Sequence, residues 1–264
     1  MPSLFVFGCG YSGSVIADRL RALGWRVAGT GAHGALAFDD DTAVRAALAT
    51  CDHALSSVPP DAEGDPVLTR YGDALTRHWL GYLSSTGVYG DSGGAWVDES
   101  AATGGGRRSA RSAADAAWLA RGARVFRLPG IYGPGRSALD RVAAGTAHRL
   151  RVPGQTFSRI HVQDIAGGVV AALTPRGGRL PPAGAYNLAD DLPCGQNAVI
   201  EHACRLLGAP IPPLQTLDQA GLSPAARAFY AENRRVANGK ARRVLGWRPR
   251  YPTYREGLAA LFRG

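Results

Sequence analysis

The chain has 264 residues, of which 45% are apolar, a length and composition typical of a globular protein with one full-sized core. No stretch reaches the roughly 18 uncharged apolar residues that span a bilayer, and the first residues lack the basic segment of a secretory signal, so we expect a cytoplasmic protein without membrane contact. The four cysteines form no C-x-x-C pair, which argues against a zinc site, another metal site of that kind or a disulfide framework.

The formal net charge of +9 raises nucleic acid as a partner. The basic residues, however, are spread from Arg19 to Arg263, and their densest group, residues 234–250, is interrupted by Gly, Pro and apolar positions. This distribution favours anionic small molecules over nucleic acid. The chain has a single lysine, Lys240.

The elements alternate along the chain. A short apolar run from Leu4 to Phe7 predicts a buried strand, and Ile16, Leu20 and Leu23 repeat at the spacing of an amphipathic helix that ends at Gly24. The same reasoning predicts further strands over 25–31, 34–41, 53–59, 79–85, 123–133 and 185–189, and further helices over 41–51, 111–122, 161–173 and 197–208.

Alternating strands and helices predict a doubly wound α/β fold, a parallel Rossmann sheet with a smaller C-terminal substrate lobe. We expect residues 1–175 to form the NAD(P)-binding domain, with 134–157 contributing to the lobe. Residues 176–264 then form mainly the lobe, and the strand at 185–189 returns to the sheet.

Gly8, Gly10 and Gly13 form a G-x-G-x-x-G motif between the first strand and the first helix. The glycines allow a tight turn, close approach of a pyrophosphate and close packing of helix on strand, so the loop, with Tyr11 and Ser12, predicts a dinucleotide site. The alternative is a glycine-rich turn without a ligand.

The sequence favours NADP over NAD, since no acidic residue lies between Asp18 and Asp39 to bind ribose hydroxyls. Thr30 and His33 stand where they could donate to a 2′-phosphate, although no arginine lies there as a clamp. At the end of the strand over 53–59, the backbone at Ser57 and Val58 is expected to pass the cofactor.

Six ordered motifs carry a resemblance over nearly the whole chain: the glycine loop, LSSTGVYG (83–90), RLPGIYGPGR (127–136), RIHVQDIA (159–166), YNLADDLP (186–193) and LGWRPRYPTYREGL (245–258). With them the chain resembles the extended short-chain dehydrogenases/reductases, above all the NAD-dependent epimerase/dehydratase group and its smaller atypical relatives. The resemblance implies a nicotinamide cofactor and a small carbonyl, hydroxyl or sugar-like substrate. It places Ser85, with Thr86, on the reacting oxygen and Pro129 and Gly130 at the cofactor. A hydroxyl that only caps the strand end is the other interpretation of Ser85.

The family's Tyr-x-x-x-Lys dyad is absent, because no tyrosine lies between Tyr89 and Tyr132 and no lysine precedes Lys240. If Asp115 aligns with the acid of that helix, Arg107 takes the tyrosine position and Arg111 the lysine position. A guanidinium cannot act as the base, but Arg111 can donate to cofactor ribose. Arg107 either meets an anionic substrate group or is solvated.

Other groups could transfer the proton. Tyr89 and Tyr132 stand just past strand ends, and His161 begins a predicted helix, where aromatic packing and a structural role are the respective alternatives. Asp98 and Glu99 lie in the loop beyond Ser85 as substrate contacts or solvated charges, and Asp164 is expected to cap its own helix.

Two functions follow from these features. The first is an atypical NAD(P)-dependent oxidoreductase or epimerase acting on a small oxygenated, anionic or sugar-like molecule. The second is a non-catalytic NADP(H)-binding sensor or scaffold, which the missing dyad favours. The small residues of SAADAAWLA (112–120) also allow a homodimer through that helix.

Overall fold

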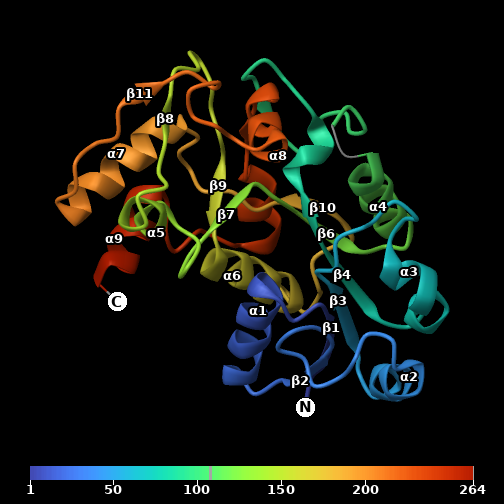
Figure 1. Cartoon of the computed structure of the whole chain (residues 1–264). Helices are drawn as coiled ribbons and strands as arrows, with labels where there is room; N and C mark the ends of the chain where they lie inside the picture. The colour runs from blue at the N-terminus through green and yellow to red at the C-terminus, as the bar shows by residue number, and fades with distance from the viewer. Residues whose placement is uncertain (107–108, 264) are drawn as a thin grey trace.

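A computed structural model describes residues 1–106 and 109–263 of the chain. Its centre is a six-stranded parallel sheet with the order β10-β6-β4-β3-β1-β2 (Figure 1). The strands are β1 (Ser3–Phe7), β2 (Arg26–Gly29), β3 (His53–Ser56), β4 (Trp79–Ser85), β6 (Arg124–Leu128) and β10 (Gly184–Asn187). The predicted parallel Rossmann sheet is confirmed.

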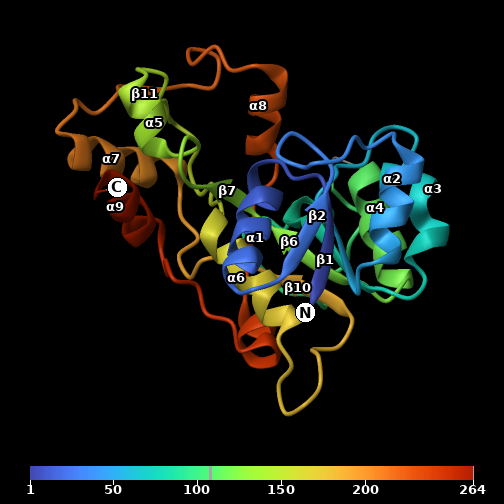
Figure 2. The same cartoon turned by 90° about the horizontal axis from the view of Figure 1, so that it is seen from below.

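Helices cover both faces of this sheet (Figures 1 and 2). One face carries α1 (Tyr11–Ala22) and α6 (Val162–Leu173), and the other carries α2 (Asp41–Ala49), α3 (Pro66–Tyr71), the 3₁₀ turn η1 (Gly72–Leu75) and α4 (Ser109–Ala120). Alternate residues of β1 face opposite layers: Leu4 and Val6 pack under α1, whereas Phe5 and Phe7 pack under α2 and α3. A strand that is buried on both faces has a continuous run of apolar residues, so SLFVF shows no alternation of polar and apolar residues.

The remaining elements lie mostly beyond the carboxyl ends of the sheet strands, at the upper left in Figure 1. Helices α5 (Ala138–Ala143), α7 (Gln196–Leu207) and α9 (Tyr254–Arg263) pack around a separate apolar cluster. Short parallel pairs link distant segments: β7 (Gly130–Tyr132) with β9 (Arg159–His161), β8 (Arg149–Leu150) with β11 (Leu214–Gln215), and β5 (Trp96–Val97) with β12 (Arg235–Val236). The short helices η2 (Thr86–Tyr89), α8 (Pro224–Ala228), η3 (Phe229–Ala231) and the π-helical turn η4 (Ala241–Leu245) complete the described chain.

The strand predicted over 34–41 is wrong. This segment makes only an isolated bridge between Thr30 and Leu36, beside the edge strand β2. The end of the segment caps the next helix. The Asp40 carboxylate accepts from Ala43 N at 3.0 Å and caps α2, so the chain turns into the helix before a strand can extend. The predicted strand over 123–133 is two strands, because β6 ends at Leu128 and β7 pairs with β9 instead of the main sheet.

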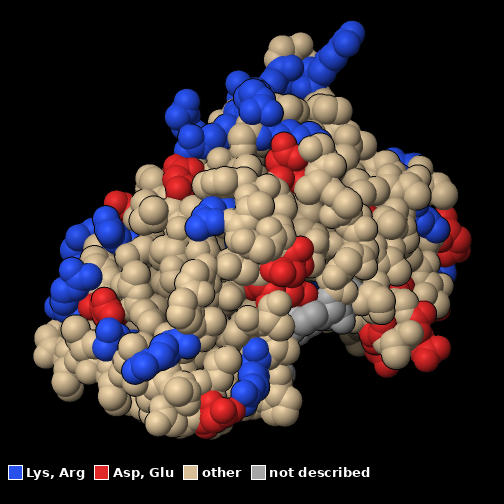
Figure 3. Space-filling view, turned by 90° about the horizontal axis from the view of Figure 1, so that it is seen from above, with Lys and Arg blue, Asp and Glu red and all other residues tan. Residues whose placement is uncertain are grey.

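No described helix is long and apolar enough to cross a membrane. Within the described ranges, all four cysteines are free and no group of His, Cys, Asp and Glu is arranged to hold a metal ion. On the face shown in Figure 3, Lys and Arg side chains are scattered among Asp and Glu and concentrate at the margins.

Candidate active site

A cleft of about 990 Å³ opens at the carboxyl ends of the central strands and extends between the sheet and the α5–α7–α9 lobe. Ligands of open α/β sheets bind at this edge, beside the point where the strand order reverses, here between β1 and β3. The cleft brings together many of the predicted site residues, from the glycine loop to the substrate motifs. These are Gly10, Tyr11, Ser12, Ser57, Ser85, Thr86, Arg111, Pro129, Gly130 and Tyr132.

The glycine loop has the geometry of a pyrophosphate cradle. Gly8 has φ +85°, and a Cβ on Gly13 would lie 2.2 Å from the Gly8 carbonyl oxygen, so both positions require glycine. A Cβ on Gly10 would meet nothing within 4 Å, so this backbone faces open space. Helix α1 starts there without a side-chain cap and without an acidic residue in its first turn, so its free N–H groups fit an anion.

Neighbouring strand ends fasten this loop. The Ser57 hydroxyl, just after β3, donates to the Gly8 carbonyl oxygen, and Gly8 N donates to Thr30 Oγ1 at 3.3 Å. The Val58 side chain also lies against Gly8. Ser57 lines the cleft, whereas Thr30 is 1% exposed, so Thr30 supports the loop and is too buried to reach a 2′-phosphate as predicted. His33 is exposed in the segment after β2, and its contact with a 2′-phosphate stays a prediction.

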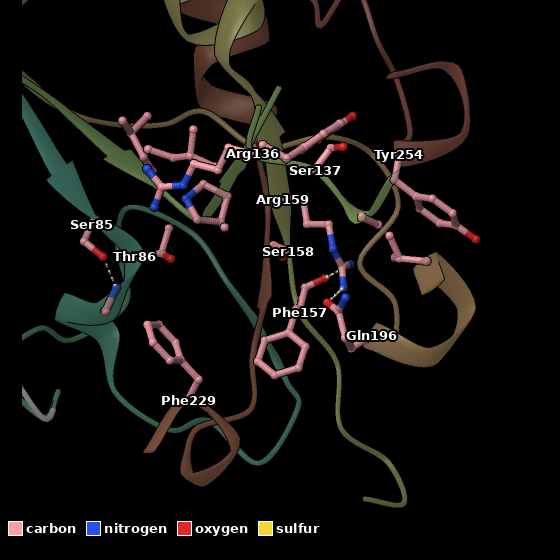
Figure 4. Close-up of a pocket in the computed structure, with 18 of the residues that line it drawn as sticks. Ser85, Thr86, Arg136, Ser137, Phe157, Ser158, Arg159, Gln196, Phe229 and Tyr254 are labelled. Carbon is pink, nitrogen blue, oxygen red and sulfur yellow. Dashed lines mark hydrogen bonds between the residues drawn. The ribbon is translucent and has the colours of Figure 1, made fainter. Parts of the chain in front are cut away.

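Ser85 ends β4 and lines the cleft (Figure 4). Its Oγ accepts from Gly87 N at 3.0 Å and caps η2. This bond uses an acceptor lone pair of the hydroxyl, and no acceptor for its proton is found among the described residues. The capping interpretation and the substrate-facing interpretation of Ser85 are therefore compatible. Thr86, next in the chain, also lines the cleft and is 4% exposed.

Arg111, on α4, reaches the cleft beside these residues. Its Nη1 donates to Tyr82 Oη at 2.9 Å, and the Tyr82 ring stacks on Trp118 with centroids 5.3 Å apart. Burial raises the pKa of Tyr82 to about 12, so this tyrosine stays a neutral phenol that holds the guanidinium. Arg107, at the tyrosine position of the family's dyad, lies outside the described residues.

The far end of the cleft is basic and aromatic. There the buried Arg159 donates to Gln196 Oε1 at 3.0 Å. Arg136 lies nearer the glycine loop, over the Tyr11 ring, with its guanidinium carbon 5.6 Å from the centroid. Figure 4 shows Arg159 and Gln196 on one side, Ser85 and Thr86 on the other, and aromatic rings between them.

The whole chain is similar to proteins of known structure. The structure of a functionally unknown conserved protein from Silicibacter pomeroyi DSS is 40% identical in sequence, with a TM-score of 0.85, and the alignment covers 100% of this chain and 99% of that one. The chain belongs to the same family as this protein. No family model matches the sequence.

More distant structures show the fold. An NAD-dependent epimerase/dehydratase from Methylobacillus flagellatus is 22% identical (TM-score 0.73, covering 99% of this chain and 98% of that one). A human epimerase family protein solved with NADPH is 18% identical (TM-score 0.75, covering 99% of each chain). The fold is therefore that of the extended short-chain dehydrogenases/reductases, the epimerase/dehydratase-like architecture that the motifs indicate.

A curated Streptomyces protein, 3-diazoavenalumate denitrifying reductase, is 34% identical over 145 residues. The match covers 51% of this chain and 45% of the reductase, so the chain spans less than half of that enzyme's length.

The structure does not bring Tyr89 into the cleft. Its hydroxyl donates to Asn187 Oδ1 at 2.7 Å and accepts from Arg127 Nη1 at 3.0 Å, and the side chain is 7% exposed. Burial raises its pKa, so the phenol is held in a structural network and is a poor base.

His161 is 2% exposed and also lies off the cleft surface. Its Nδ1 accepts from Gln163 N at 3.2 Å and caps α6, which is the structural alternative. Burial lowers its pKa to about 4, so the ring stays neutral near pH 7. Tyr132 lines the cleft, but its Oη is buried, has no hydrogen-bond partner among the described residues, and has a raised pKa.

Two predicted roles of acids need correction. The Asp164 carboxylate accepts from Arg250 N at 2.5 Å and Tyr251 N at 3.2 Å, so it holds the C-terminal segment against α6 instead of capping its own helix. Glu99 is partly buried and accepts from Asn187 N at 2.7 Å, so it is neither a solvated charge nor free for a substrate. Asp98 accepts from Ser100 N at 2.9 Å and is exposed, in agreement with the solvated alternative.

Sequence reasoning missed the residues of the far end of the cleft. Arg159 lies inside RIHVQDIA, where one acid balances its charge, so that segment gave no signal. Arg136, beside Tyr11, lies inside RLPGIYGPGR, whose two arginines without an acid were an available signal. No sequence signal pointed to Gln196, because its partner Arg159 is 37 positions away.

Proposed function

We propose that the protein is an NAD(P)-dependent oxidoreductase of the short-chain dehydrogenase/reductase type, acting on a small oxygenated substrate. The observation that carries the proposal is that one cleft joins the glycine cradle to Ser85 and Thr86. A dinucleotide lying on Gly10 and extending along this cleft would bring its nicotinamide toward Ser85, and the remaining space would take the substrate.

The chain's own residues have distinct tasks in this scheme. The backbone at Gly10 and the N-terminus of α1 would hold the pyrophosphate, and Arg111 would donate to the nicotinamide ribose. Ser85 would donate a hydrogen bond to the reacting oxygen while keeping its proton, and the bond from Gly87 N fixes the direction of that hydroxyl.

The cofactor, when bound, supplies or accepts a hydride at carbon. In the direction of reduction the substrate oxygen gains a proton, and we assign that proton to water, which the open cleft admits. Without the family's tyrosine base, the chain acts mainly by orienting the reactants and polarising the oxygen. The similarity to a reductase and to an NADPH-bound epimerase family protein supports this chemistry and a nicotinamide cofactor.

NADP is the proposed form of the cofactor. No acidic residue lies between Asp18 and Asp39, so no carboxylate of the second strand would repel a 2′-phosphate, and the exposed His33 can donate to one. A sensor or scaffold that only binds NADP(H) is the alternative, and it does not require the space beyond Ser85.

The test begins with separate titrations of NADPH and NADH, followed by nicotinamide fluorescence. We expect micromolar NADPH binding and weaker NADH binding, followed by NADPH-dependent reduction of a member of a carbonyl substrate panel. Failure of both dinucleotides to bind would overturn the proposal, and tight binding without turnover of any panel member would favour the sensor.

Ser85→Ala then tests the assigned role. Turnover should fall by roughly 10²-fold while NADPH affinity is unchanged, because the lost donor acts on the reacting oxygen. Ser100→Ala, in an exposed loop, is the matched control and should keep the wild-type rate. An unchanged rate in Ser85→Ala would remove Ser85 from the mechanism.

A further inference from the structure

Arg159 is a buried cation without a carboxylate partner among the described residues. The residue is 7% exposed. Its Nη1 donates to the carbonyl oxygens of Phe157 at 3.0 Å and Cys194 at 3.1 Å and to Cys194 Sγ at 3.2 Å, and its Nη2 donates to Gln196 Oε1 at 3.0 Å. These acceptors are neutral and use three of the five N–H groups. A buried charge is costly unless an opposite charge offsets it. The remaining donors belong to a side chain that lines the cleft.

Asp190 lies beside Arg159 in the fold, because its backbone N donates to Arg159 O at 2.7 Å. Its carboxylate does not pair with the guanidinium: Oδ1 accepts from Leu192 N, and Oδ2 is buried with no partner in the described chain. Burial raises the pKa of Asp190 to about 7, so this group is only partly ionised at neutral pH. Arg159 acts against this rise in pKa, so the two groups interact at a distance, but Asp190 makes no ion pair with the guanidinium.

Gln196 supplies a second donor at the same corner. Because arginine only donates, the bond to Arg159 requires the Gln196 oxygen on that side, which fixes the amide orientation. The Nε2 atom is then buried with no acceptor among the described residues, which is unfavourable unless a ligand supplies one. Gln196 is also the first residue of α7, which has no side-chain cap and no acidic residue in its first turn. The uncapped N-terminus adds positive potential there.

The surroundings of this corner match an anion attached to a flat apolar body. Arg141 lies near Arg159 and Tyr230, and Arg136 and His148 also line the cleft, so its lining is rich in basic groups. The acids nearby are already used: Asp140 accepts from Ser137 in a capping box, and Glu232 pairs with Arg234 at 2.8 Å. Aromatic and apolar side chains cover the region between this corner and Ser85, namely Phe157, Tyr230, Phe229 and Leu222.

We propose that Arg159 and Gln196 form the subsite for the carboxylate of a flat, unsaturated or aromatic carboxylic acid, which is the substrate class of this cleft. The identification of this acid as the substrate rests on the proposed function. The anion subsite itself does not require that the protein turns the acid over. A planar carboxylate presents two oxygens to the two free guanidinium N–H groups and the Gln196 amide, and its apolar body covers the aromatic wall.

The test measures binding calorimetrically, with cinnamate as the probe and cinnamamide as its neutral analogue of the same shape. We expect cinnamate to bind the wild-type protein at least tenfold more tightly than cinnamamide. Gln196→Glu places a carboxylate against Arg159, so cinnamate affinity should fall at least tenfold while cinnamamide affinity is unchanged. Gln163→Glu adds the same charge off the cleft and should bind cinnamate as the wild type does.

Gln196→Met separates lost donation from added repulsion. It removes the amide without adding charge, and cinnamate affinity should fall about threefold or more. Unfolding curves verify that each variant is folded.

Three results would overturn the proposal: equal affinity of the wild type for the two probes, binding of neither probe, or undiminished cinnamate binding in Gln196→Glu. Inorganic phosphate that displaces cinnamate at equal or lower concentration would show a phosphate subsite and overturn the carboxylate assignment. NADPH binding is titrated separately. If the wild-type protein does not bind NADPH but still prefers cinnamate, only the proposed function is contradicted.

Discussion

The guanidinium of Arg127 and the carboxylate of Asp115 form a buried ion pair, with Nη2 2.7 Å from Oδ1 and side chains only 4% and 2% exposed. Ser84 Oγ donates to the same carboxylate at 2.6 Å, and Arg127 also donates to Tyr89 Oη. The pair therefore ties α4 to the ends of β4 and β6. Ser85 and Arg111 stand on these elements, so their separation across the cleft depends on this pair.

Asp115→Ala should destabilise the protein by roughly 3–5 kcal/mol, because it leaves the Arg127 charge buried without its partner. Urea unfolding at pH 7 measures the change. Asp73→Ala is the matched control, since the Arg45–Asp73 pair is exposed and its removal should not shift the midpoint measurably. Equal effects of the two substitutions would contradict the structural role assigned to the buried pair.

Gly10→Ala and Gly13→Ala should separate cofactor binding from folding. The new Cβ at position 10 would occupy open space, so the unfolding midpoint should stay at the wild-type value while NADPH affinity falls at least tenfold. At position 13 the Cβ would lie 2.2 Å from a backbone oxygen, so stability itself should fall by about 1–3 kcal/mol. Wild-type NADPH affinity in Gly10→Ala would show that the pyrophosphate lies elsewhere.

Asp190→Asn should stabilise the protein at alkaline pH. Burial raises the pKa of this carboxyl in the folded state from 3.8 to about 7, so the folded protein binds more protons than the unfolded chain between these values. Wild-type stability then falls as pH rises through this window, by on the order of 4 kcal/mol from this group alone. Denaturation at pH 4 and pH 8 should give similar stabilities of the two proteins at pH 4 and a more stable variant at pH 8. A constant difference across the window would refute the shift.

His161→Asn should show the opposite slope. Burial lowers the pKa of His161 from 6.5 to about 4, so the unfolded chain binds the extra proton and wild-type stability falls as pH drops through this range. Asparagine keeps the capping of α6 without titrating. The loss of stability from pH 7 to pH 4 should be smaller in the variant by on the order of 3 kcal/mol. Turnover at pH 7 should persist, because the ring lies off the cleft; its abolition in a folded variant would return His161 to catalysis.

Local sequence was enough for the features whose physics is local. The glycine loop is an example, because turn geometry, close approach and helix start all depend on Gly8, Gly10 and Gly13 themselves. The strand over 79–85 agrees with β4 at both ends. The strand prediction over 34–41 was wrong because a short apolar run forms a strand only when a neighbouring edge is available for pairing along its length.

The polar roles depended on tertiary partners that sequence order does not reveal. Asp164 resembles a helix cap, yet its partners are backbone groups 86 and 87 positions later. Tyr89 stands past a strand end as a base would, yet Asn187, 98 positions away, takes its hydroxyl. Ser85 was predicted as a candidate from a motif, and only the geometry shows that its cap leaves the proton free.

The return of β10 to the sheet also sets the order in which the sheet closes during synthesis. The chain leaves the sheet at Leu128 and rejoins it at Gly184, which pairs with Arg124. Until the later segment emerges from the ribosome, one edge of β6 presents unpaired N–H and C=O groups. A chain interrupted before residue 184 would expose a buried, apolar edge to other nascent chains. The pairing of β10 thus covers this edge of β6 and leaves a strand of only four residues as the edge of the sheet on that side.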